Sequence, residues 1–317
     1  MIEQVEMRKV MADWVQNKMA EDENLVIVDA DLARANGTLG IRDNFPDRAL
    51  DVGIAESNMA SVAAGLASYG FKPFIFSFCP FVTRRICDQV TISIVYAKQN
   101  VKIVGTDPGI AAAFNGGTHM TQEDIGVMRS IPGMIIYEPA DGAQLLKALP
   151  QIYDYDGAIY IRLFRKVPAK TYFNDENYKF DLFKADVMKE GSDVTLFTSG
   201  IEVKEAMDAA ELLEKEGIKA EVINVHTIKP IDRETVIASV KKTGCAVSCE
   251  NHNIIGGLGS AIAEVLTQEY PVPMEYIGTK DHFSEVGKTD YLVKKYHMDA
   301  ESIKEAAKKV MQKKVEK

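Results

Sequence analysis

Three short segments of the sequence carry side chains that could do chemistry. Residues 51–58 (DVGIAESN) bring Glu56 to the start of a predicted helix, directly after a short strand. Residues 116–120 (GGTHM) form a glycine-rich loop that delivers His119. Residues 162–165 (RLFR) place two arginines at the end of a predicted strand. Active sites of parallel α/β sheets form where such strands end, so the three segments are candidates for one site.

Each segment also has a plainer interpretation when it is taken alone. Glu56 suits the N-terminal turn of a helix, where a carboxylate is stabilised by about 0.3–1 kcal/mol. His119 suits an exposed turn as well as acid–base chemistry. Arg162 and Arg165 could be surface charges, although guanidinium groups also bind phosphate and carboxylate groups. Spacing alone therefore does not identify a reaction.

Apolar periodicity predicts the elements that would position these residues. Short apolar runs that alternate with longer helical segments are typical of βαβ units, in which a parallel sheet is covered on both faces. In the first half, the predicted helices are residues 5–19, 57–68, 81–98, 122–130 and 142–152, and the predicted strands are residues 25–28, 74–76, 101–104, 134–137 and 158–162.

The alternation stops at residues 166–191, which contain Pro168, a polar run and scattered aromatics. We therefore predict domains at residues 1–168 and 192–317, joined by a linker over residues 169–191. The predicted fold class is α/β, with two parallel or mostly parallel sheets. The second domain is expected to contain strands 194–198, 220–224 and 245–249, and helices 202–215, 233–242, 258–268 and 300–315.

The composition excludes several classes of protein. The 317 residues are 46% apolar and 26% charged, which argues against a disordered chain and suits two domains. The net charge of −9 argues against nucleic acid or an anionic membrane as a partner. No stretch approaches the ~20 apolar residues of a membrane span. Four cysteines without a CxxC pair, and no signal-peptide pattern at the N-terminus, predict a cytoplasmic protein.

Taken together and in order, the segments resemble the C-terminal half of transketolase along almost the whole chain. The resemblance implies a thiamine diphosphate pyrimidine-binding domain followed by a transketolase C-terminal domain. It rests on residues 48–59 (RALDVGIAESNM), 63–67 (AAGLA), 72–74 (KPF) with Phe78 and Phe81, 117–119 (GTH), 221–224 (EVIN), 227–232 (TIKPID) and 250–259 (ENHNIIGGLG).

The resemblance assigns cofactor contacts to four residues. Glu56 matches the glutamate that hydrogen-bonds to the aminopyrimidine ring of thiamine diphosphate, where a desolvated carboxyl can share a proton with a ring nitrogen. Phe78 and Phe81 match the aromatic wall against which that ring packs. Asp31 matches a residue that lines the cleft for cofactor and substrate.

The resemblance also implies substrate contacts. His119 matches a histidine near the reacting carbon of the donor sugar, so it joins Glu56 as a catalytic candidate. Arg165 matches an arginine that binds the substrate phosphate. Arg8 lies 23 residues before Asp31, the family's spacing for a second phosphate-binding arginine. Arg162 is a second-rank candidate for the same role.

Three positions depart from the transketolase pattern. Ala35 stands where the family usually has serine, and Asp107 stands where it has a second substrate histidine. Arg84 replaces a tyrosine, and the run from residue 84 to 89 is more similar to deoxyxylulose-phosphate synthase or a dehydrogenase β subunit. These departures leave the identity of the sugar substrates open.

The family motif for the diphosphate and Mg²⁺, Gly-Asp-Gly followed further on by Asn, is missing from the chain. The resemblance therefore implies the C-terminal subunit of a split transketolase, in which an N-terminal partner subunit supplies the Mg²⁺ ligands. Such a transferase moves a two-carbon ketol unit between sugar phosphates, as in the pentose phosphate pathway. We expect two copies of each chain in a heterotetramer.

Two alternatives remain open from the sequence. One is the β subunit of a 2-oxo-acid dehydrogenase or an enzyme similar to deoxyxylulose-phosphate synthase, which would share this architecture. The other is a non-catalytic paralogue. The Gly-Thr-His loop favours transketolase over the first alternative, and the presence of Glu56, Phe78, Phe81 and His119 argues against the second.

Overall fold

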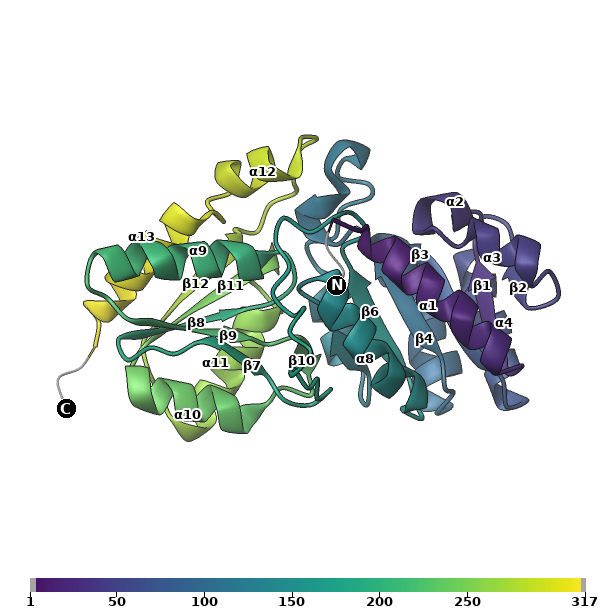
Figure 1. The fold of residues 1–317 in the computed structure, drawn as a ribbon, viewed down its shortest axis with the longest axis horizontal. Coiled ribbons are helices and arrows are strands. Elements are labelled where there is room, and N and C mark those ends of the chain that lie inside the picture. Colours follow the sequence, from purple (N-terminus) through teal and green to yellow (C-terminus); the bar gives the residue numbers. More distant parts are fainter. Residues whose placement is uncertain (1–3, 315–317) are drawn as a thin grey trace.

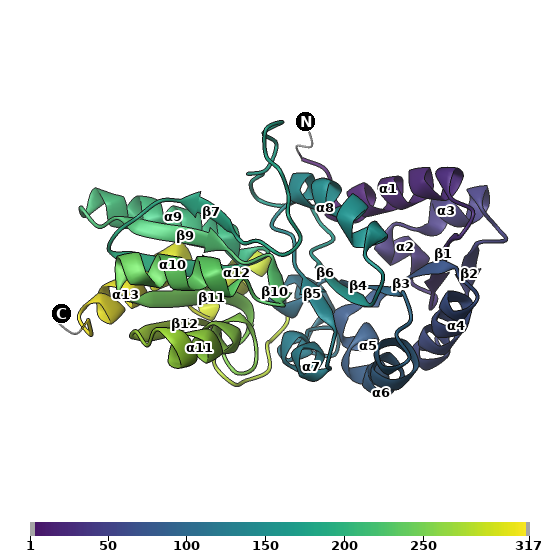
Figure 2. The ribbon, with the colours of Figure 1, turned by 90° about the horizontal axis from the view of Figure 1, so that it is seen from below.

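Two α/β domains lie side by side in the computed structural model, which describes residues 4–314 (Figures 1 and 2). Each domain is built on one mostly parallel sheet with helices on both faces. This arrangement confirms the predicted fold class.

The first sheet has seven strands, all parallel to their neighbours except the antiparallel edge strand β10. Across the sheet they run β10 (Thr227–Lys229), β5 (Ile135–Tyr137), β6 (Ile159–Leu163), β4 (Lys102–Thr106), β3 (Lys72–Phe78), β1 (Leu25–Asp29) and β2 (Ala49–Asp51).

Figure 2 shows α1 and α8 on one face of this sheet and α4 to α7 on the other. The helical segments are α1 (Met7–Glu21), α2 (Ala33–Asn36), α3 (Leu39–Asn44), α4 (Glu56–Ser68), α5 (Cys79–Val82), α6 (Cys87–Gln89), α7 (Asp124–Ser130) and α8 (Gly142–Asp154), with two 3₁₀ segments, η1 (Arg84–Ile86) and η3 (Gly109–Asn115), and one π-helix, η2 (Val90–Tyr96).

The second sheet has five strands, and only the edge strand β7 is antiparallel to its neighbour. Its order is β12 (Met274–Thr279), β11 (Ala246–Asn253), β8 (Val194–Thr198), β9 (Ala220–Asn224) and β7 (Asp186–Lys189). Helices α9 (Glu202–Lys215) and α13 (Ala300–Met311) cover one face, and α10 (Arg233–Thr243) and α11 (Leu258–Glu269) cover the other (Figure 1).

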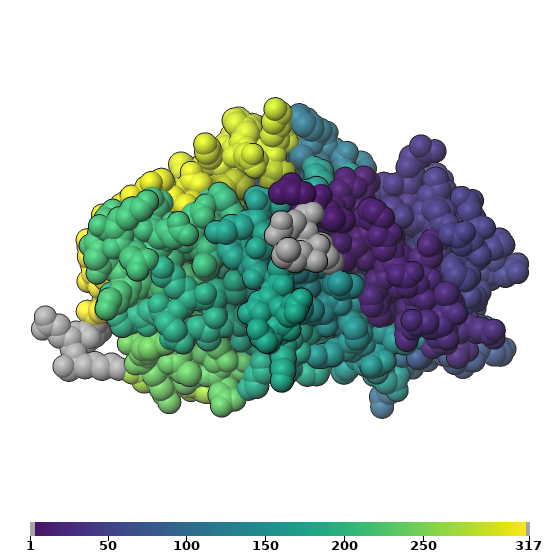
Figure 3. Space-filling view, viewed as in Figure 1, coloured from purple at the N-terminus to yellow at the C-terminus, as the bar shows by residue number. Residues whose placement is uncertain are grey.

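Helix α12 (Thr289–Lys295) reaches from the second domain to the first. It lies against η3 of the first domain. In the space-filling view, the yellow surface of the C-terminal region meets the blue surface of the first domain at the top of the molecule (Figure 3). The contact between the domains is therefore continued by a segment outside both sheets.

The short apolar runs behave as sequence periodicity predicts. All five residues of β1, β4, β6, β8 and β9 are buried. A strand reads as a continuous apolar run when helices cover both faces of its sheet, and the burial of these strands follows from that arrangement.

Strand β10 ties the two domains together. It follows β9 of the second sheet in the chain, yet it pairs with β5 of the first sheet, with Thr227 opposite Tyr137. Apolar side chains of the second domain, among them Phe197 and Ile223, also pack into the main core of the first. Because the domains share a sheet and a core, their relative position is fixed by packing. The sequence patterns did not predict this exchange.

The predicted helix over residues 81–98 is wrong as a continuous element. The chain breaks at Thr83, whose backbone is not helical (φ −116°, ψ −90°) and whose hydroxyl donates to the Cys79 carbonyl over 2.6 Å. Short 3₁₀, α and π segments replace the single helix. Arg84 and Arg85 follow the break directly, so their direction is set by it.

Two further differences concern chain segments that the sequence treated as simple. The predicted linker over residues 169–191 contains β7, whose half-exposed side chains at the sheet edge give little apolar pattern. The limits of the two predicted domains stay a prediction. The last helix ends at Met311, and the predicted end at residue 315 lies outside the described residues.

Candidate active site

Glu56 is the first residue of α4, and its side chain is only 4% exposed. The N-terminus of a helix favours a negative charge, which offsets part of the cost of burying the carboxylate. The only hydrogen bond found for its side chain among the described residues comes from Arg85, whose Nη1 donates to Oε1 over 2.5 Å. The carboxylate is therefore a buried acceptor that faces a planar donor.

Three rings meet next to Glu56. Phe78 ends β3 and Phe81 lies in α5, with their ring centroids 6.0 Å apart. The His119 ring approaches both, at 5.4 Å from Phe78 and 5.3 Å from Phe81, in edge-to-face geometry. The end of β3 and the glycine-rich loop thus bring together the three aromatic candidates from the sequence.

Arg85 fills the space between Glu56 and this aromatic group. Its guanidinium carbon lies 3.8 Å from the centroid of the Phe81 ring while its Nη1 donates to Glu56. A flat group that bears N–H donors therefore fits here, stacked on an aromatic ring with a buried carboxylate at its edge. The aminopyrimidine ring of thiamine diphosphate has the same two features, so these residues fit that half of the cofactor.

The surroundings of His119 favour its neutral form. Partial burial and the positive charge of Arg85 hold the pKa of His119 below its usual value. Its Nδ1 lies 2.9 Å from the Thr118 hydroxyl, which orients the ring. Arg84 holds the same loop by donating to the Thr118 carbonyl over 3.3 Å and pairing with Glu123 at 2.6 Å. A neutral imidazole in this position can accept or donate a proton.

Asp31 lies just beyond the carboxyl end of β1 and is exposed. Its backbone is left-handed (φ 61°), and its N–H donates to Asp51 Oδ1 over 3.1 Å. Asp51 also accepts from Gly53 and pairs with Arg42, so it fixes the turn that leads to Glu56. Asp31 therefore lies at the sheet edge that carries Phe78, and its backbone is bonded to the turn before Glu56.

Arg8 and Arg165 converge on one backbone atom. The Ala35 carbonyl accepts from Arg8 Nη1 over 2.8 Å and from Arg165 Nη1 over 3.1 Å. The Arg165 guanidinium also lies 5.1 Å from the Phe78 ring, which connects this pair to the aromatic group. Two arginines separated by 157 residues in the chain thus form one basic group beside the rings.

Asp107 belongs to the same group of residues. It is fully buried, and its Oδ2 lies 2.7 Å from Arg165 Nε. Burial raises the pKa of Asp107, and the nearby charges of Arg165 and Lys166 oppose that rise. The residue that departs from the family pattern therefore contacts a predicted substrate arginine directly.

Arg162 does not join this site, which corrects its prediction as a substrate ligand. Its side chain has no exposed surface. Its Nε donates to Asp124 over 2.7 Å, and its other nitrogens bond to Glu138 and, over 2.7 Å, to the Asn251 carbonyl. Arg162 is a structural ion-pair residue between the domains because every side of its guanidinium is already used.

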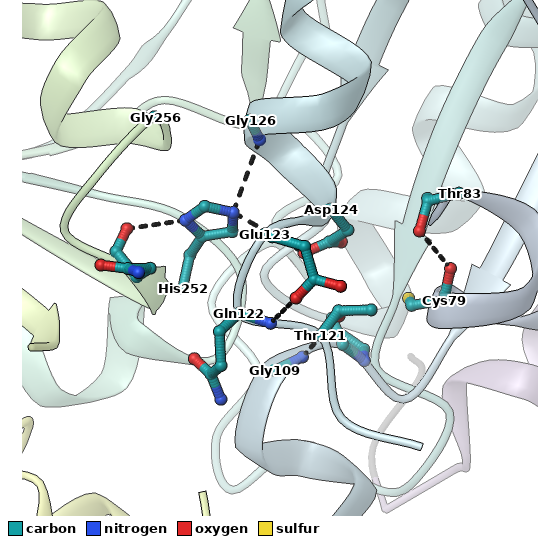
Figure 4. A network of polar contacts seen from close by, with 12 residues as sticks. Cys79, Thr83, Gly109, Thr121, Gln122, Glu123, Asp124, Gly126, His252 and Gly256 are labelled. Carbon is teal, nitrogen blue, oxygen red and sulfur yellow. Dashed lines mark hydrogen bonds and ion pairs between the residues drawn. The ribbon is translucent and has the colours of Figure 1, made fainter. Parts of the chain in front are cut away.

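A polar network around Arg162 was missed by the sequence reasoning. Figure 4 shows the His252 imidazole from β11 beside Gly126 and Asp124 of α7. Its Nε2 accepts from Gly126 N at 3.5 Å, and its Nδ1 lies 2.7 Å from the Asn253 carbonyl. The neighbouring Asn251 side chain accepts from Ile110 N over 2.9 Å. The motif ENHN at 250–253 was the available signal, but nothing in it indicated an interdomain role.

Within residues 4–314, the structure has no cluster of three His, Cys, Asp or Glu side chains that could hold a metal ion. Over the same residues, no helix is long and apolar enough to cross a membrane. The four cysteines form no disulfide.

The fold and this site define a member of the transketolase family, to which the chain belongs. The family descriptions that match are "Transketolase, pyrimidine binding domain" over residues 3–168 and "Transketolase, C-terminal domain" over residues 183–303. In domain content and length, the chain corresponds to the C-terminal subunit of a split transketolase.

Three similar proteins illustrate this correspondence. The 6-deoxy-6-sulfo-D-fructose transketolase subunit SqwH of Clostridium sp. (strain MSTE9) is 50% identical over 308 residues, 97% of this chain and 95% of that protein. An apulose-4-phosphate transketolase subunit of Phocaeicola vulgatus is 34% identical over 297 residues, 93% and 94% of the two chains. A solved split-gene transketolase, described as an inactive β4 tetramer, is 37% identical with a TM-score of 0.90, and the match covers 98% of this chain and 100% of that one.

Proposed function

We propose that this chain is the C-terminal subunit of a thiamine diphosphate-dependent transketolase. In this proposal it transfers a two-carbon ketol unit from a ketose with an anionic end group. The observation that carries the proposal is the guanidinium of Arg85, which stacks on Phe81 and donates to buried Glu56. It marks a place for a planar ring with N–H donors at the site where the family binds its cofactor.

The proposed roles follow from the contacts of each residue. When bound, the cofactor supplies the electron sink for the two-carbon unit. Glu56 accepts a hydrogen bond from the pyrimidine and holds its proton, while Phe78 and Phe81 pack against the ring. His119 moves a proton at a sugar hydroxyl, since its neutral form is favoured. Asp31 lines the edge of the cleft.

The diphosphate end of the cofactor and Mg²⁺ require a second chain in this proposal. Mg²⁺ prefers hard oxygen ligands such as carboxylates, and the described residues offer no suitable cluster. An N-terminal subunit with the diphosphate-binding domain would provide them, in a heterotetramer with two copies of this chain. The unpaired cysteines support a reducing, cytoplasmic setting.

Arg8 and Arg165 are proposed to bind the anionic end of the sugar, because two guanidinium groups at one point suit an oxyanion. The relatives named above act, by their names, on a sulfonated ketose and on a sugar phosphate, and both substrates carry such an end group. The proposal therefore covers a sulfonate or a phosphate at this position.

The test uses the chain assembled with its N-terminal subunit, thiamine diphosphate and Mg²⁺. We expect ketose donors to lose two carbons to an aldose acceptor, as followed by mass spectrometry. Arg165→Met should raise the KM of anionic donors by roughly 10- to 100-fold and leave that of an uncharged ketose unchanged. Lys9→Met, which removes an exposed charge of α1, is the control. Turnover of pyruvate and not of ketoses would favour the dehydrogenase or synthase alternative.

A further inference from the structure

The two arginines of the proposed anion site each have a carboxylate partner. Glu6 pairs with Arg8 through both oxygens, at 2.8 Å to Nε and 3.1 Å to Nη2. Asp107 lies 2.7 Å from Arg165 Nε. The pair therefore offers an incoming anion much less positive charge than two free guanidinium groups would.

The two carboxylates differ in how firmly they are held. The Glu6 side chain is 41% exposed, so it can leave Arg8 for solvent when a ligand arrives. The Asp107 side chain has no exposed surface, and its N–H donates to the Leu163 carbonyl over 3.0 Å. An L-residue in its left-handed conformation (φ 56°) stays there only when the surroundings hold it. Asp107 is therefore a fixed part of the site.

A third cation completes the local charge. Lys166 follows Arg165, its Nζ is 3.4 Å from the Ala111 carbonyl, and its charge acts on Asp107. Arg8, Arg165 and Lys166 against Glu6 and Asp107 leave one net positive charge. Ala35 presents its carbonyl oxygen to both arginines and has no side-chain donor for a further anionic oxygen.

We propose that Asp107 makes this site selective for a monoanionic sulfonate over a dianionic phosphate monoester at the end of the donor sugar. The inference rests on the proposed function, since it concerns the same anion site. A sulfonate brings one negative charge, which matches the net charge of the site. A phosphate monoester brings about −1.5 to −2 at pH 7, and the excess is repelled by a buried carboxylate that cannot move away.

The test compares three donors in the assembled enzyme: 6-deoxy-6-sulfo-D-fructose, D-fructose 6-phosphate and D-fructose, with glycolaldehyde as a common uncharged acceptor. We expect kcat/KM to be at least about tenfold higher for the sulfonate than for the phosphate, mainly through KM. A phosphate donor as good as the sulfonate, with both better than fructose, overturns the inference and leaves the proposed function standing. If neither anionic donor exceeds fructose, the anion site of the proposed function fails as well.

Asp107→Asn assigns the effect to this residue because it removes the charge and keeps the shape. We expect the preference for sulfonate to fall severalfold, through a lower KM for the phosphate donor, with the control Glu234→Gln unchanged. Glu234 is an exposed carboxylate of the second domain that pairs with Lys184. An unchanged preference in folded Asp107→Asn, checked by its melting temperature, overturns the assignment. If that variant does not fold, Asp107→His is tested in the same way.

Discussion

Arg85 donates a hydrogen bond to Glu56 over 2.5 Å, and through it a half-exposed cation satisfies a carboxylate that is almost fully buried. The same guanidinium stacks on Phe81. The chain thus provides its own partner for the group that, in our proposal, binds the cofactor. Cofactor and Arg85 compete for one acceptor and one aromatic face.

This competition predicts the effect of Arg85→Met, which keeps the stem and removes the guanidinium. The complex with the N-terminal subunit should bind thiamine diphosphate roughly two- to fivefold more tightly, because a half-exposed ion pair contributes only about 0–1 kcal/mol. Isothermal titration calorimetry measures this Kd directly. Arg84→Met is the matched control, since Arg84 pairs with Glu123 and not with Glu56. Weaker binding by Arg85→Met would mean that Arg85 contributes to the cofactor site.

Glu56→Gln tests the proposed acid–base role. The amide keeps the size of the side chain and can still meet Arg85, so we expect a folded protein with an unchanged circular dichroism spectrum. Loss of the proton-holding group should lower kcat by about 10²- to 10⁴-fold. Steady-state turnover at saturating thiamine diphosphate is the measurement. A kcat within a few-fold of the parent protein would remove Glu56 from the chemistry.

Arg162→Met separates a structural role from a substrate role. The change leaves Asp124 and Glu138 buried without their shared cation, which should cost about 3–5 kcal/mol of the free energy of unfolding. Urea denaturation measures this cost. Lys9→Met, which breaks the exposed pair with Asp13, should cost no more than about 1 kcal/mol. A stable Arg162→Met protein with a raised KM would restore the substrate role that the burial of Arg162 contradicts.

Glu250 predicts a pH dependence of stability. Burial raises the pKa of Glu250 to about 7, although the Leu258 and Gly259 amides donate to its carboxyl group. The folded state therefore keeps a proton that the unfolded chain releases above about pH 4.5. This contribution to stability is complete below about pH 4.5 and is lost as the pH rises through 7.

Glu250→Gln removes this titration. Between pH 4.5 and 8, the free energy of unfolding of the variant should improve by about 3 kcal/mol relative to the parent protein. Urea denaturation at several pH values gives this difference. The exposed Glu264→Gln is the control. A difference between Glu250→Gln and parent that does not change with pH would contradict the protonated state of buried Glu250.

The sequence predicts elements best where a single period dominates. Strand Val194–Thr198 and helix Glu202–Lys215 have the predicted limits, because each buries one clear apolar run or face. The segment around Thr83 failed for the opposite reason: its apolar residues have helical spacing, but a side-chain bond to the backbone and a non-helical dihedral break the helix. Strand β10 could not be predicted, since its pairing with β5 depends on how two domains meet.

The candidate site shows the same division. Glu56, Phe78, Phe81 and His119 lie together as the sequence segments suggested, because strand ends and their loops share one sheet edge. Arg162 and Arg165 are alike in sequence, three residues apart, yet Arg162 is fully buried and Arg165 is not. Their opposite fates depend on the buried carboxylates of other elements, which spacing along one strand does not reveal.

Whether this chain holds half of a thiamine active site is tested most directly by two-carbon transfer, measured before and after reconstitution. The purified chain is assayed with thiamine diphosphate, Mg²⁺, an anionic ketose and an aldose acceptor, alone and with increasing amounts of the N-terminal subunit. We expect no turnover by the chain alone and activity that rises until the two subunits are equimolar. Robust turnover by the chain alone would show that its active site is already complete, and the proposed division between two chains would be wrong.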